Sequence, residues 1–192
     1  MITFLSLLFM AATGGASAPS AIDTFCAPLE KQAGRKGNAQ QIFADLASYE
    51  KDEEARWTVL RDKRELDQYA ETDGAYTQAF IWRQAKGTFV SMFFTSPTGD
   101  WVMYGDYCYR ADGTLARLVS RLNTFVVQAE KDKDGLVSRI RTKYFGSNGH
   151  LLQSRTRVEN PRTHRPTKVS FTDFEDRVFE TLSDLPFSSL LR

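Results

Sequence analysis

The 192-residue sequence lacks the motifs on which most enzyme sites depend. It contains no phosphate-binding Gly-Lys loop, no Gly-x-Ser-x-Gly, no His-Glu-x-x-His and no Cys-x-x-Cys. Its two histidines, His150 and His164, cannot by themselves supply a three-ligand metal site. The sequence therefore predicts a non-enzymatic protein with no metal or other cofactor.

The acidic residues do not form a catalytic pair either. Asp100 and Asp106 are six positions apart on an expected strand, which separates them by roughly 20 Å. Asp132 and Asp134 resemble the start of a calcium loop, but the lysines between and before them oppose cation binding. We interpret that run as a solvated turn.

Long hydrophobic runs are absent except at the N-terminus. Residues 4–12 are mostly apolar and are followed by small residues that end in Ala16-Ser17-Ala18, the order typical of a secretory signal peptide. The run is too short to span a bilayer, and no Lys or Arg precedes it. We predict a signal peptide over residues 1–18, cleaved after Ala18 or Ala16, and a single domain over residues 19–192, exported to the periplasm or the extracellular space.

Cysteine is scarce, and export changes how the two residues are interpreted. In an oxidising compartment, Cys26 and Cys108 are most simply one disulfide, although two free buried thiols are the alternative. The bridge would close a loop of about 80 residues and stabilise the domain by about 4.5 kcal/mol. A nucleophilic Cys108 is disfavoured because no histidine is placed near it in an expected strand.

No strong excess of either charge is present, since the formal net charge is +1. A nearly neutral chain argues against nucleic acid as a partner. The distribution is uneven, however. Residues 50–73 hold nine acidic and five basic side chains, and residues 114–168 hold twelve basic and four acidic ones. The two ends of the fold are expected to differ in the sign of their charge.

Two helices are predicted from spacing and capping. Residues 39–55 carry apolar side chains three and four positions apart, which predicts an amphipathic helix. Residues 63–70 follow Asp62, an N-cap residue, with Glu65 three positions later, which predicts a second and shorter helix.

After Gly74 the pattern becomes one of short β-rich runs separated by turns such as Asp112-Gly113 and Asn148-Gly149. We predict strands over residues 75–84, 88–95, 100–110, 114–127, 136–145 and 150–158, with further strands at 168–171 and 178–182. The expected fold is α+β: an N-terminal helix on a curved antiparallel meander of six to eight strands, an open half-barrel whose end residues 182–191 close. At the level of fold alone it resembles the periplasmic half-barrel carriers of lipoproteins.

Basic residues occupy alternate positions of three expected strands. They are Arg117 and Arg121, then Arg139, Arg141 and Lys143, then Arg155 and Arg157. Because side chains alternate along a strand, we expect these cations to share one face of the sheet. The face is either simply the solvated side of the sheet or a surface that binds an anionic envelope component, such as a polysaccharide, a lipid headgroup or an acidic partner.

Aromatic residues alternate in the earlier strands. Tyr76, Phe80, Trp82, Trp101 and Tyr107 either pack in the core or line an apolar pocket. The pocket would make the protein a carrier of an apolar small molecule or a lipid. Binding through the basic face is our first hypothesis, and the carrier is the alternative.

Overall fold

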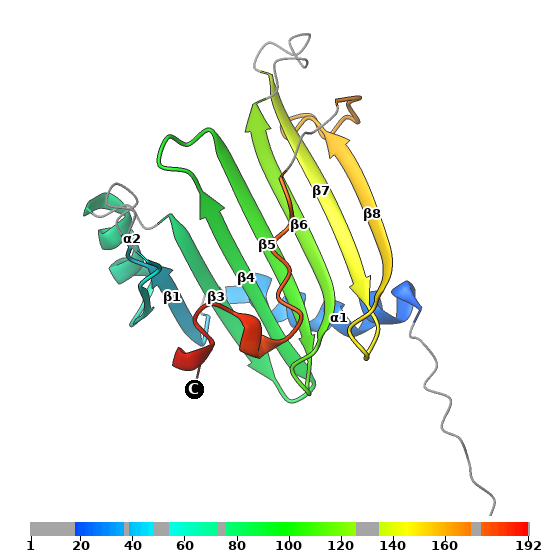
Figure 1. The fold of residues 1–192 in the computed structure, drawn as a ribbon, viewed down its shortest axis with the longest axis horizontal. Coiled ribbons are helices and arrows are strands. Elements are labelled where there is room, and N and C mark those ends of the chain that lie inside the picture. Colours follow the sequence, from blue (N-terminus) through cyan, green and yellow to red (C-terminus); the bar gives the residue numbers. More distant parts are fainter. Residues whose placement is uncertain are drawn as a thin grey trace, which may run out of the picture.

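The computed structural model describes residues 18–36, 39–47, 54–72, 76–125, 135–169 and 174–191. In these residues the strands form one open antiparallel sheet of eight strands, in the order β2-β1-β3-β4-β5-β6-β7-β8 (Figure 1). The fold is therefore a β-rich α+β fold. The elements are α1 (Pro19–Lys36), β1 (Gln41–Asp45), β2 (Trp57–Leu60), α2 (Lys63–Thr72), β3 (Thr77–Gln84), β4 (Gly87–Thr95), β5 (Trp101–Arg110), β6 (Leu115–Phe125), β7 (Leu136–Phe145), β8 (Leu151–Glu159), and the 3-10 helices η3 (Leu182–Asp184) and η4 (Ser188–Leu190).

The first helix, α1, packs on one face of the sheet, which we call the helix face. Ile22, Cys26 and Leu29 lie four and three positions apart, so they share one side of α1, and all three are buried. They pack against helix-face side chains of β3 to β7, which are Trp82, Phe89, Cys108, Ala116 and Tyr144. The Cys26–Cys108 disulfide is present and joins α1 to β5, in the middle of the sheet.

The C-terminal segment, residues 174–191, crosses the opposite face, which we call the C-terminal face (Figure 1). Leu185 and Phe187 are buried in the core on this side. The hydroxyl of Tyr107 donates a hydrogen bond to the backbone oxygen of Arg177 at 2.7 Å, and that of Tyr109 donates to Phe179 at 3.1 Å. The sheet is thus the middle layer, covered by a helix on one side and by an irregular strap on the other.

The sequence predictions for the hairpins and for the second helix are confirmed. Gly113 and Gly149 have positive φ values of 84° and 79°, which suits glycine in the tight turns that lead into β6 and β8. Asp62 caps α2, because its carboxylate accepts hydrogen bonds from the backbone N–H groups of Arg64 and Glu65.

The predicted helix over residues 39–55 is wrong, because part of this range forms β1. Ile42, Phe43 and Ala44 are consecutive and all buried, since both faces of β1 are covered. Ile42 and Ala44 belong to a cluster with Leu66 of α2, while Phe43 stacks on Phe187 of the C-terminal segment. A strand buried on both faces loses the period of two, so its apolar spacing imitated a helix.

Other expectations differ from the structure or fall outside it. Cys26 lies within α1, a helix that was not predicted. Residues 178–182 form no strand and contribute only an isolated bridge between Thr114 and Thr181. Residues 168 and 169 are not strand either, and 170 and 171 lie outside the described residues, as does the predicted signal peptide apart from Ala18. Within the described residues, no helix has the length and apolar character needed to cross a bilayer.

Candidate functional site

The seven basic residues expected on one face are divided between two. Arg117 and Arg121 of β6 lie directly opposite Tyr144 and Ile140 of β7. Paired residues of antiparallel strands share a face, so these arginines lie on the helix face with Tyr144. The three cations of β7 alternate with Tyr144 and Ile140 and therefore lie on the C-terminal face; they are Arg139, Arg141 and Lys143.

The basic residues of β8 also lie on the face opposite to those of β7. Arg155 and Arg157 are paired with Thr142 and Ile140, which places them on the helix face. The expectation of one continuous basic face is therefore wrong. The reason is the register, because odd-numbered residues of β7 pair with even-numbered residues of both neighbouring strands. Odd-numbered residues of β7 therefore lie on the face opposite to the odd-numbered residues of β6 and β8.

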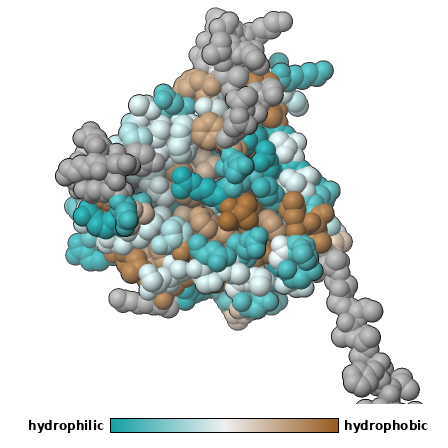
Figure 2. Space-filling view, in the orientation of Figure 1, coloured by the Kyte–Doolittle hydropathy of each residue, from teal (hydrophilic) through white to brown (hydrophobic). Residues whose placement is uncertain are grey.

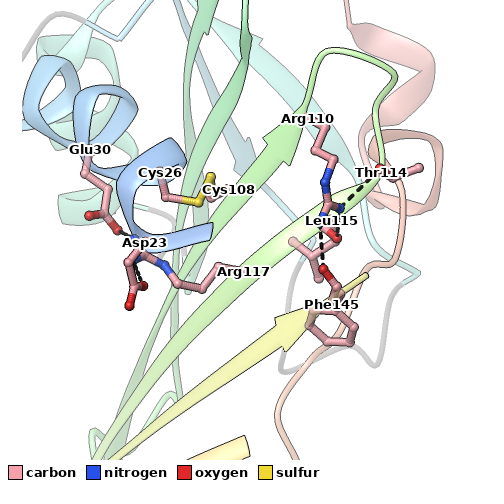
Figure 3. The surroundings of a disulfide bond; sticks show 9 residues. All are labelled: Asp23, Cys26, Glu30, Cys108, Arg110, Thr114, Leu115, Arg117 and Phe145. Carbon is pink, nitrogen blue, oxygen red and sulfur yellow. Dashed lines mark hydrogen bonds and ion pairs between the residues drawn. A yellow bond between two sulfur atoms is a disulfide. The ribbon is translucent and has the colours of Figure 1, made fainter. Parts of the chain in front are cut away.

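On the helix face, Arg117 forms ion pairs with α1. Its guanidinium donates to Asp23 at 2.6 Å and also to Glu30, beside the disulfide (Figure 3). Arg155 lies over the ring of Tyr144, with 5.5 Å between its Cζ atom and the ring centroid. Arg121 and Arg157 are exposed, and the Nε atom of Arg157 is 3.4 Å from Glu159.

On the C-terminal face, the three cations of β7 converge on one carboxylate. Asp176 of the C-terminal segment lies 2.9 Å from the Nζ atom of Lys143, 3.0 Å from Arg141 and 3.4 Å from Arg139. We call these four residues the β7 cation cluster. The side chain of Asp176 is fully buried, while those of Arg141 and Lys143 remain 26% and 19% exposed. Figure 2 shows hydrophilic residues gathered across the middle of this face.

The cluster keeps Asp176 ionised. Burial by itself would raise the pKa of this carboxyl, but hydrogen bonding from Lys143 and the positive charges of Lys143 and Arg141 outweigh it, and the pKa lies below its usual value. Among these four residues, one negative charge therefore faces three positive ones. Such an excess, partly exposed, favours the approach of an anion.

The five aromatic residues of the candidate pocket do not come together. Phe80 and Trp82 lie on the helix face, with ring centroids 6.2 Å apart. Trp101 and Tyr107 pack into the core of the C-terminal face, and Tyr76 is partly buried just before β3. A hollow of about 360 Å³ exists elsewhere, lined by Gln40, Gln41, Val59, Leu60 and Arg83. The five residues therefore line no common pocket.

The remaining candidates for chemistry lie apart from one another. His150 is exposed in the turn before β8, and His164 contacts Glu159 at 3.2 Å. Asp106 accepts a hydrogen bond from Ser91, and burial raises its pKa. Asp132 and Asp134 lie outside the described residues. Among the described residues, no group of three His, Cys, Asp or Glu side chains could hold a metal ion.

Sequence reasoning missed Asp176, the residue that defines the cluster. Little local signal was available, because Asp176 stands between two other charged residues, Glu175 and Arg177. The apolar residues nearby, Phe174, Val178 and Phe179, all pack against the core. An acidic residue among core residues is expected to meet a cation. The path of the C-terminal segment across the sheet decides which cation Asp176 meets, and no local sequence pattern predicts that path.

Comparison with known proteins was made by family model, by curated sequence and by solved structure, and none of the three gives a match to this chain.

Proposed function

We propose that this protein is exported and binds a phosphate-bearing component of the cell envelope at the β7 cation cluster. The observation that carries the proposal is the convergence of three cations on one carboxylate, with two of the cations partly exposed. Cations held at alternate positions of a strand are fixed on one face by the sheet, so they need little reorganisation to receive an anion.

The charge of the cluster favours phosphate over a single carboxylate. Among the four residues of the cluster, one carboxylate faces three cations, and two of these cations, Arg141 and Lys143, are partly exposed. A phosphate monoester carries roughly 1.5 to 2 negative charges at pH 7 and offers three acceptor oxygens. Its oxygens can therefore bridge Arg141 and Lys143 and match more of their positive charge than one carboxylate does.

Export is supported by two independent features. The first is the order of apolar and small residues over positions 1–18. The second is the Cys26–Cys108 disulfide, a bond that persists in oxidising compartments. An exported protein meets phosphate mainly as free phosphate and as the headgroups of lipids.

Binding, rather than catalysis, fits the state of the carboxylate. Asp176 is surrounded by cations that lower its pKa, which makes it a weak base, and the side chain is fully buried. The cluster therefore offers charge and hydrogen-bond donors to a ligand but no group suited to proton transfer.

The proposal is tested with inorganic phosphate in calorimetry and with vesicles containing phosphatidic acid in co-sedimentation. We expect binding that weakens between about 0.05 M and 0.5 M salt, because salt screens the partly exposed cations. The double variant Arg141→Ser and Lys143→Ser removes the two accessible cations, and we expect it to bind at least about tenfold more weakly.

The matched control removes two cations from the other face, Arg155→Ser and Arg157→Ser, and should bind as the unmodified protein does. Binding of vesicles without binding of free phosphate would identify a lipid headgroup as the ligand. Equal losses in both double variants would show that only the total charge matters, and no binding of either probe would overturn the proposal.

A further inference from the structure

The strand β8 forms one edge of the sheet, at the right in Figure 1. At its end, the backbone of residues 165–167 pairs with it: the N–H of Thr167 donates to the oxygen of Val158 at 3.0 Å, and the N–H of Asn160 donates to the oxygen of Arg165 at 2.9 Å. These bonds show that the oxygen of Val158 and the N–H of Asn160 point away from β7.

The same alternation directs the backbone of Ser154 and Thr156 outward, because both precede Val158 by an even number of residues without an intervening bulge. In the described part of the chain no backbone group pairs with these two residues from outside. Their N–H and C=O groups can therefore form hydrogen bonds with an additional strand.

The side chains on this edge are suited to an acidic partner. Arg155 and Arg157 are exposed on the helix face, and Arg157 keeps 66% of its side chain exposed. On the other face, Ser154 and Thr156 are small and exposed, so they do not obstruct an incoming strand. Leu151 and Leu152 add exposed apolar surface at the beginning of β8, at 52% and 37% exposure.

A second copy of this chain is a poor occupant of the edge. Two β8 strands paired antiparallel would bring Arg155 and Arg157 of one copy beside those of the other, on the same face. Like charges directly opposite each other destabilise a strand pair. A strand with carboxylates at alternate positions would instead form cross-strand ion pairs with both arginines.

We infer that the edge of β8 binds an extended, acidic segment of a partner polypeptide as a ninth strand. The backbone of Ser154 and Thr156 supplies the ladder, Arg155 and Arg157 select acidic side chains, and Leu151 and Leu152 contact an apolar residue at one end. The bridge between Glu159 and Pro166 sets the other end of the site. The inference goes beyond the proposed phosphate site and does not depend on it.

The test uses a labelled seven-residue peptide that alternates valine with glutamate, and a matched peptide that alternates valine with lysine. We expect fluorescence anisotropy to show binding of the glutamate peptide only. On binding, hydrogen exchange should slow at the amides of Ser154 and Thr156, whereas the amides of the opposite edge strand, β2, should not change.

Two variants separate the backbone contribution from the charge contribution. Ser154→Pro removes an outward N–H that makes no bond to β7, a position where an edge strand tolerates proline, and should abolish peptide binding. Ser147→Pro in the exposed turn before β8 is its control and should bind normally. The pair Arg155→Ser and Arg157→Ser should weaken binding at least about tenfold.

The variant Arg141→Ser with Lys143→Ser, which removes the phosphate site, should retain peptide binding, so the two proposals can fail separately. Equal binding of both peptides, no protection at Ser154 and Thr156, or a homodimer that forms through β8 in sedimentation would each overturn the inference. If Ser154→Pro does not fold, the exchange measurement on the unmodified protein decides.

Discussion

At the scale of single residues, the two layers that cover the sheet are held by the same kind of contact, a carboxylate paired with cations of the strands. Asp23 and Glu30 of α1 pair with Arg117 on the helix face, and Asp176 of the C-terminal segment pairs with three cations on the other face. Each covering layer thus offers carboxylates to cations that the strands hold in place. Since a buried charge is costly without a partner, these contacts fix where each layer lies.

The replacement Asp176→Asn tests the importance of that contact. It leaves three cations clustered without a negative charge, and removing one partner of a buried ion pair costs about 3 kcal/mol or more in unfolding free energy. Urea unfolding at pH 7 should show this loss, whereas Glu175→Gln, an exposed neighbour, should change little.

The dependence on pH follows from the same carboxyl. Its pKa is lower in the folded protein than in the unfolded chain, so its contribution is fully present above the unfolded pKa of about 3.9. This contribution to stability is lost as the pH falls through the pKa of Asp176 in the folded protein. The unmodified protein should therefore lose stability below about pH 4 more steeply than Asp176→Asn, and parallel acid profiles of the two proteins would contradict the assignment.

At the scale of elements, the hairpins could be predicted and the covering layers could not. Turns such as Asn148-Gly149 are local signals, and the strands on either side end within one or two residues of them. The helix α1 was missed because its apolar stripe of Ile22, Cys26 and Leu29 lies next to the expected cleavage site. In addition, Pro28 lies inside the helix. The C-terminal segment is not a regular helix or strand, so its buried residues do not recur at the spacing of either.

The C-terminal segment belongs to the core, so a change in its buried residues should destabilise the whole domain. Phe187 is fully buried, and its ring lies 4.5 Å from that of Phe43 and 4.8 Å from that of Trp57. Phe187→Ala should cost about 4 kcal/mol, and the near-ultraviolet circular dichroism of Trp57 should change. Phe125→Ala, at a side chain that is 62% exposed, is the matched control and should cost less than about 0.5 kcal/mol. Similar losses in both variants would contradict this role.

At the scale of the whole molecule, the sheet separates two surfaces that the sequence could not distinguish. The alternation of basic residues was read correctly within each strand, but the relation between strands depends on register. The bulge between Tyr144 and Phe145 sets the register of β8 on β7, and it is not visible as a local pattern. The seven basic residues therefore divide between two faces, and the two proposed sites lie on the C-terminal face and at the edge of β8 instead of on a single surface.

The disulfide should determine the stability of all three layers together. It joins α1 to the central strand β5 across 82 positions, and both covering layers pack on the same sheet. Replacing Cys26 and Cys108 with serine should lower the free energy of unfolding by about 4 kcal/mol, because the unfolded chain regains the entropy of a long loop. Unfolding should remain a single transition when followed by circular dichroism and by tryptophan fluorescence. Reductant should have the same effect on the unmodified protein and none on the double variant. Two separate transitions in the variant would show instead that α1 detaches while the sheet and the C-terminal segment stay folded.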